Sequence, residues 1–282
     1  MKKSNLNSLL IMTSVLLAVE GRAQIVLTSE AYSGFVYDDD PNNALYQIDS
    51  NSSNDGSSAT LSSSAYDEDY QFTATSSATA SSQSLKAQAV GALNAVNTGV
   101  GFDVFTNSPD GLGNPDTYVS SAKAAYSETL TYGGTAVHYN SRYILNFTGT
   151  IEGYNNYAVI TLQHANNAVQ QWVFSEPGDY NETLVSNAFV HGQFPQDFSL
   201  SIQSTVNLNT LDGAPQSGEV DLGHTLNVVG IDLRDNTGAL LTGDSVTGES
   251  GSVYNIVAVP EPSSGLLFLL GASSLALRRS RR

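Results

Sequence analysis

The sequence of 282 residues contains no cysteine, and this absence removes several classes of function. Without a thiol, the chain can form no disulfide, thiolate metal site, iron–sulfur cluster or cysteine nucleophile. Basic residues are also scarce, since 11 Lys and Arg stand against 27 Asp and Glu and give a formal net charge of -16. A surface this acidic repels phosphate backbones, which excludes nucleic acid as a partner.

The composition nevertheless supports a folded protein. Hydrophobic residues make up 40% of the chain, and 282 residues are enough to enclose a sizeable core. We therefore expect one large domain between two short terminal segments.

The first 23 residues have the layout of a secretory signal peptide. Lys2 and Lys3 precede an apolar run over residues 9–19, and small residues at the end of this segment lead to Ala23. We interpret the run as a signal helix that signal peptidase removes by cutting after Ala23. The alternative is an N-terminal core helix.

The other end of the chain is built in three parts. Pro260, Glu261 and Pro262 are followed by an apolar stretch over residues 263–277 and then by four arginines, Arg278, Arg279, Arg281 and Arg282. As a helix, the 15 apolar residues reach about 22 Å, short of the roughly 30 Å hydrocarbon layer. We expect a short transmembrane helix with the arginines as its cytoplasmic stop and an extended Pro-Glu-Pro segment outside.

These three parts resemble the PEP-CTERM sorting signal of Gram-negative bacteria over residues 259–282. The resemblance implies export, retention in the inner membrane and processing by an exosortase-type membrane protease. It places Pro260, Glu261 and Pro262 in the signature motif, and it suggests an exopolysaccharide matrix as the setting. The alternative is an ordinary membrane anchor at the C-terminus. Residues 128–134 and 250–254 are also loosely similar to exported sandwich proteins that carry this tail.

The body between the two ends, residues 24–258, is more acidic than the whole chain. The signal contributes three basic residues and one acidic residue, and the tail contributes four and one. The body therefore keeps 25 acidic residues and the four basic residues Lys86, Lys123, Arg142 and Arg234, a net charge of -21. Such a body should be soluble and should attract divalent cations or basic partners.

Period-two alternation predicts β-strands along the body. It is clearest over residues 198–208, where one face would carry Phe198, Leu200, Ile202, Val206 and Leu208. Residues 70–80 and 118–132 show it too, and weaker versions cover 142–151, 157–163, 172–175, 184–190 and 218–233. We also expect a strand over 84–97 and a Ser-rich loop over 50–64.

Turn residues separate these runs, and the body contains no convincing amphipathic helix. The fold class that we expect is therefore all-β: an antiparallel two-sheet β-sandwich, jelly-roll-like.

The sequence shows no hydrolase elbow, zinc-protease helix, phosphate loop or dinucleotide fingerprint. The four histidines, His138, His164, His191 and His224, are separate in the sequence and are expected at surface or edge positions without a catalytic or metal role. A pair of carboxylates could still form a glycosidase-like site.

Two ligands remain as hypotheses, with no resident cofactor expected. Ca²⁺ would suit the acidic segments 38–43, 67–69 and 110–116, although none matches an EF-hand. A glycan would suit Tyr154 and Tyr157, which flank Asn155 and Asn156 in an expected turn. We expect a non-catalytic surface or matrix protein; the alternatives are a carbohydrate-binding module acting on exopolysaccharide and a glycan hydrolase.

Overall fold

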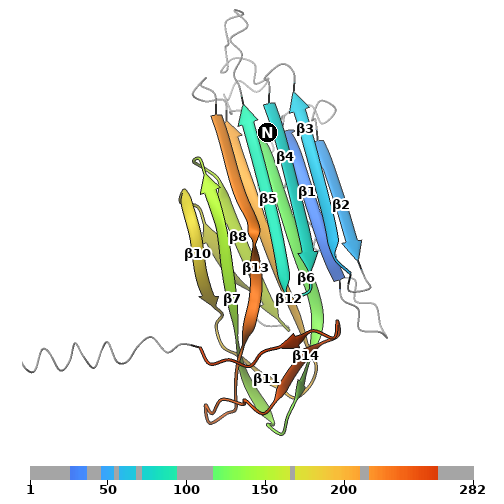
Figure 1. Ribbon diagram of the computed structural model, residues 1–282, viewed down its shortest axis with the longest axis vertical. Coiled ribbons are helices and arrows are strands. Elements are labelled where there is room, and N and C mark those ends of the chain that lie inside the picture. The colour runs from blue at the N-terminus through green and yellow to red at the C-terminus, as the bar shows by residue number, and fades with distance from the viewer. Residues whose placement is uncertain are drawn as a thin grey trace, which may run out of the picture.

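The computed structural model describes residues 26–36, 46–53, 57–67, 72–93, 117–165, 169–209 and 216–259 (Figure 1). The regular elements in these ranges are fifteen β-strands. They are β1 (Val26–Val36), β2 (Tyr46–Ser53), β3 (Ala59–Asp67), β4 (Phe72–Ser81), β5 (Ser84–Leu93), β6 (Thr117–Gly133), β7 (His138–Glu152), β8 (Tyr157–His164), β9 (Gln170–Phe174), β10 (Gly178–Val185), β11 (Phe189–Gly192), β12 (Gln196–Asn209), β13 (Gln216–Arg234), β14 (Ser245–Gly248) and β15 (Val253–Tyr254).

The strands form two sheets in which all paired strands are antiparallel. The eight-stranded sheet has the order β9-β8-β12-β6. Beyond β6, its far edge is shared by β1, which pairs with residues 117–127, and by β14, which pairs with residues 130–133. Strand β2 pairs with β1, and β15 pairs with β14.

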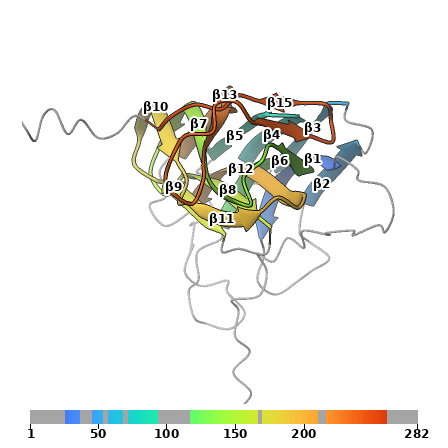
Figure 2. The same cartoon turned by 90° about the horizontal axis from the view of Figure 1, so that it is seen from below.

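The seven-stranded sheet has the order β10-β7-β13-β5-β4-β3. Strand β11 pairs with residues 138–141 of β7, on the same edge that β10 occupies further along. Seen from the end of the molecule, the two sheets form two layers (Figure 2).

One apolar core lies between the two sheets. Its largest fully buried side chains come from both layers: Tyr126, Tyr139, Tyr143, Phe147, Phe198, Leu85, Leu93, Leu130 and Leu145. Burial of a side chain of this size contributes roughly 1.5–3 kcal/mol each. The core is aromatic around β7 and β12, whereas β4, β5 and the first half of β6 contribute mainly alanines.

The alternation that was clearest in the sequence is confirmed in β12. In β12 the side chains of Phe198, Leu200 and Ile202 are buried and those between them are partly exposed. The segment 84–97 is a strand over Ser84–Leu93, as expected. The alternation of apolar and polar side chains along the pleat therefore determines which face of the strand lies inward.

The expected Ser-rich loop over residues 50–64 is wrong for most of its length. Residues up to Ser53 belong to β2, and β3 begins at Ala59. Here Ser and Thr occupy a pleated strand in which Ala59 and Ser63 face inward and Thr60, Ser62 and Ser64 face solvent. Small hydroxyl side chains are compatible with either environment, so composition alone suggested a loop.

The weak strand expected over residues 184–190 is also wrong, because it is two strands. Strand β10 ends at Val185 and β11 begins at Phe189. Between them the Ser186 hydroxyl accepts a hydrogen bond from the Tyr143 N–H at 2.8 Å and donates one to the Asn187 carbonyl at 2.8 Å. A side chain thus replaces part of the backbone ladder and interrupts the pairing.

Candidate functional site

Most of the predicted sorting residues lie outside the described part of the chain. This holds for Ala23, for Pro260, Glu261 and Pro262, and for the four arginines Arg278, Arg279, Arg281 and Arg282. Among the described residues, none belongs to a helix that is both apolar enough and long enough to cross a membrane. The structure does describe the residues that lead directly into the predicted tail, up to Val259.

The end of β13 carries the side chain that contacts Val259. Ile231 and Leu233 face the core, so Asp232 and Arg234 lie on the other face of the strand. The chain then reverses at Asp235, whose Oδ1 accepts hydrogen bonds from the N–H groups of Thr237 at 2.8 Å and Ala239 at 2.9 Å. Hydrogen bonds from the Thr237 side chain, the largest cause, and from Ala239 lower the pKa of Asp235.

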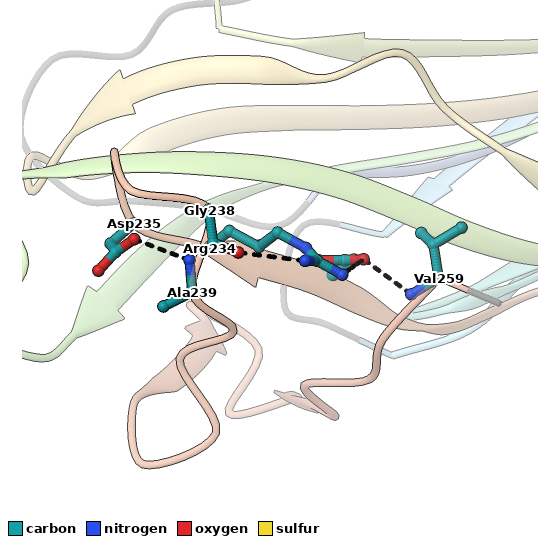
Figure 3. A network of polar contacts seen from close by, with 6 residues as sticks. Arg234, Asp235, Gly238, Ala239 and Val259 are labelled. Atoms are coloured by element: carbon teal, nitrogen blue, oxygen red, sulfur yellow. Dashed lines mark hydrogen bonds and ion pairs between the residues drawn. The ribbon is translucent and has the colours of Figure 1, made fainter. Parts of the chain in front are cut away.

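Asp232 is the centre of the polar network at this place. Figure 3 labels its partners Arg234 and Val259, whose contacts meet at the Asp232 carboxylate. Arg234 donates two hydrogen bonds to its carboxylate, from Nε at 2.7 Å and from Nη2 at 3.1 Å. The N–H of Val259 donates a third, at 2.7 Å. Arg234 also donates from Nη1 to the Gly238 carbonyl at 3.1 Å, which ties the network to the turn.

The burial of Asp232 makes these three donors necessary. Its side chain is 1% exposed, and a carboxylate removed from water is costly unless it is paired and hydrogen-bonded. The two-point contact with Arg234 has the geometry in which guanidinium and carboxylate groups bind most strongly. The Val259 N–H therefore satisfies a buried charge as well as fixing the chain.

Residues 255–259 lie beside β13 as a short parallel segment. The Ile231 N–H donates to the Asn255 carbonyl at 2.8 Å, and the Val257 N–H donates to the Ile231 carbonyl at 3.0 Å. Ile256 forms a parallel bridge with Ile231 and packs against the core. Pairing of β5 with β13 ends at Asn227, so this segment covers the next part of the same strand.

Gly230 allows this close approach. A Cβ atom at residue 230 would lie 2.6 Å from the Asn255 carbonyl oxygen and 2.7 Å from a methyl group of Val257. Any other residue would push the segment away from β13. We call residues 255–259, together with Asp232, Arg234 and Gly230, the C-terminal anchor.

The two tyrosines proposed for glycan contact lie at the β7–β8 turn, as the sequence predicted. Tyr154 is 85% exposed, and Tyr157 is half-buried at the start of β8. Of the two amides in this turn, Asn155 is exposed beside Tyr154, but Asn156 is buried and does not add to the surface. Asn156 is 1% exposed, and its side chain accepts from the Asn207 N–H at 3.0 Å and donates to the Glu152 carbonyl at 2.5 Å.

His164 lies in the core, contrary to the expected surface or edge position, whereas His191 lies on the edge strand β11 with its side chain buried. His164 and His191 are buried, with ring centroids 4.9 Å apart. The Tyr143 hydroxyl lies 2.6 Å from His164 Nδ1, and Ser141 donates to His191 Nε2 at 2.7 Å because His191 Nδ1 donates to the Gly192 carbonyl. Desolvation lowers the pKa of His164 to about 3 and also lowers that of His191.

Glu128 is a second buried polar centre, on the inward face of β6. Its carboxylate accepts hydrogen bonds from the Ser250 hydroxyl at 2.8 Å and from the Tyr254 hydroxyl. Burial, followed by the nearby Tyr126 and Glu128, raises the pKa of Tyr254 far above its usual range. The two loosely matched segments, 128–134 and 250–254, therefore lie against each other.

The calcium hypothesis falls mostly outside the described residues. Residues 38–43, 68–69 and 110–116 are not described, and of Asp67 only the backbone is. Within the described ranges, no group of three His, Cys, Asp or Glu side chains could hold a metal ion.

Sequence reasoning missed the C-terminal anchor. The available signal was Arg234, one of four basic residues in the body, placed two residues after an acid and directly before the turn sequence Asp235-Asn236-Thr237-Gly238. Neither the protein-family models nor the curated proteins contain a match to this chain.

Proposed function

We propose that this chain is an exported, non-catalytic protein of the cell surface or extracellular matrix, which is held at the inner membrane by its C-terminal segment and then processed there. Residues 1–23 serve as the signal helix, residues 263–277 as the short membrane helix, and Pro260, Glu261 and Pro262 as the motif that an exosortase-type protease reads. Signal peptidase and this protease are the partners in maturation.

The C-terminal anchor is the observation that carries this proposal. The two sheets and their core are assembled from residues up to Val259, whose N–H binds the buried Asp232 carboxylate. A cut on the far side of Val259 therefore leaves every described strand in place. The strand order β5-β13-β7-β10 opposite β6-β12-β8-β9 further supports a jelly-roll sandwich for the released body.

Replacing Pro260, Glu261 and Pro262 together by alanine tests the sorting role. We expect the unprocessed precursor to accumulate in the inner membrane, detected by cell fractionation and intact mass. The matched control is Tyr154→Ser, which changes an exposed residue of the body and should mature like the wild type. Normal maturation of the triple variant would contradict the proposal. Deletion of the four terminal arginines should separately weaken membrane retention, because it removes the topological stop.

A carbohydrate-binding role is the second candidate, and the 85% exposure of Tyr154 favours it. An exposed aromatic ring on a turn fixed by Asn156 could stack on a sugar face. If so, Tyr154→Ser should reduce pull-down of the secreted protein by exopolysaccharide, whereas Val173→Ser, at another exposed apolar residue, should not. Equal retention of both variants would remove this role for Tyr154.

A further inference from the structure

In the C-terminal anchor, backbone N–H and carbonyl groups that another protein could bind are already hydrogen-bonded within the chain. Extended peptides are commonly bound by strand addition, through main-chain hydrogen bonds along one edge. In residues 255–259 the inward groups are already engaged, since the Asn255 carbonyl and the Val257 N–H bond to Ile231 and the Val259 N–H bonds to Asp232. While the segment is docked, these groups cannot pair with a protease.

The hydrogen bond to Val259 is the last contact in this series, and it differs from the others. Asn255 and Val257 bind backbone groups, whereas Val259 binds a charged side chain that is itself buried. A hydrogen bond to a charged group is about twice as strong as a neutral one. Release of Val259 would also leave the Asp232 carboxylate short of a donor (Figure 3).

We propose that Asp232 fixes the boundary between the folded body and the part of the chain that a processing protease can reach, so that cleavage falls on the carboxyl side of Val259. Asp232 is a positioning residue in this role, because it acts by holding the substrate backbone. The inference rests on the proposed function only for the identity of the natural partner, a membrane protease that acts on the tail.

Limited digestion of the full-length chain in detergent tests this boundary with a protease of broad specificity, proteinase K. Intact mass of the resistant fragment gives its carboxyl end. We expect the wild-type fragment to end at Val259 or beyond. In Asp232→Asn, one oxygen becomes an NH₂ group, which opposes either Arg234 Nε or both Arg234 Nη2 and the Val259 N–H. The share of fragments that end before Val259 should then rise at least about tenfold, because one hydrogen bond to a charged group is lost.

Two further variants make the result specific. Gly230→Ala leaves the carboxylate intact but displaces Asn255 and Val257, so it should shorten the fragment in the same way. Asp235→Asn makes the same charge change in the exposed neighbouring turn and should leave the wild-type end. Near-UV circular dichroism checks that each variant is folded. If Asp232→Asn does not fold, the fragment end of Gly230→Ala tests the proposal.

The proposal is overturned if wild-type fragments end before Val259, or if the folded variants with altered anchors end where the wild type ends. The sorting role is judged separately, by maturation in cells. If the variant with alanine at residues 260–262 matures normally, the proposed function fails while the boundary measured with proteinase K stands.

Discussion

Individual residues in the core of this protein carry polar groups that must satisfy one another. The Ser141 hydroxyl binds His191, the Tyr143 hydroxyl binds His164, and the Tyr254 hydroxyl binds Glu128. A buried polar group that loses its partner costs roughly 1–3 kcal/mol, so these pairs specify how the aromatic half of the core packs.

His164 should make the protein sensitive to acid. Its folded pKa of about 3 lies below the ordinary value of 6.5, so the unfolded chain binds the proton more readily. The resulting stability is complete above about pH 6.5 and is lost as the pH falls towards 3. For His164 alone we expect a loss of about 2 kcal/mol between pH 7.5 and pH 5. Urea unfolding at the two pH values measures it.

His164→Asn provides the control for this pH dependence. The amide keeps a polar atom near the Tyr143 hydroxyl but does not titrate. In this variant, the free energy of unfolding should therefore differ between pH 7.5 and pH 5 by about 2 kcal/mol less than in the wild type. The pH effect of His191 remains. An unchanged difference would show that His164 does not titrate on unfolding.

Among the elements, the β7–β8 turn shows how a short connection can be held rigid. Asn155 adopts a φ of +64°, a conformation that Asn tolerates better than most residues. Asn156 then places its side chain under the turn, between the Glu152 carbonyl and the Asn207 N–H at the end of β12. The turn is thus tied to both sheets.

Removing the Asn156 amide should loosen this turn. For Asn156→Ala we expect a loss of about 1–3 kcal/mol in the free energy of unfolding, because the Glu152 carbonyl and the Asn207 N–H lose their partner. Tyr154→Ser, two residues away but exposed, should change it by less than about 0.5 kcal/mol. Urea denaturation of both variants compares them; equal stability would mean that water replaces the amide.

The inward face of a strand could be predicted from the sequence more readily than the strands that pair with it. Alternation along 198–208 and 118–132 identified the inward faces, because a period of two follows directly from the pleat. It says nothing about which strand lies alongside. The pairing of Ile231 with Ile256, the meeting of His164 with His191 and the contact of Tyr254 with Glu128 all depend on the order of strands across two sheets. The period-two alternation alone therefore could not identify the anchor at Asp232.

At the scale of the whole molecule, charge is the dominant feature. Four basic residues stand against 25 acidic ones in residues 24–258, so most carboxylates have no cation with which to pair. Their mutual repulsion acts over the Debye length, which falls from about 30 Å at 0.01 M salt to about 8 Å at 0.15 M. A compact state with this charge is destabilised by its own field.

Added salt should accordingly stabilise the protein. We expect the free energy of unfolding, measured with urea because guanidinium is itself a salt, to rise between 0.01 M and 0.15 M NaCl. The rise should shrink at pH 4, where many of the carboxylates are protonated. A stability that is independent of salt at pH 7.5 would indicate that the acidic residues are too widely spaced to repel one another.

The parallel placement of residues 255–259 beside β13 has a mechanical consequence. Consider a pull on the chain at Val259 that is directed along the axis of this segment. The hydrogen bonds at Ile231 and Asp232 are then loaded together in shear instead of being peeled open one after another. Under such a load these hydrogen bonds would have to break together before the segment leaves β13.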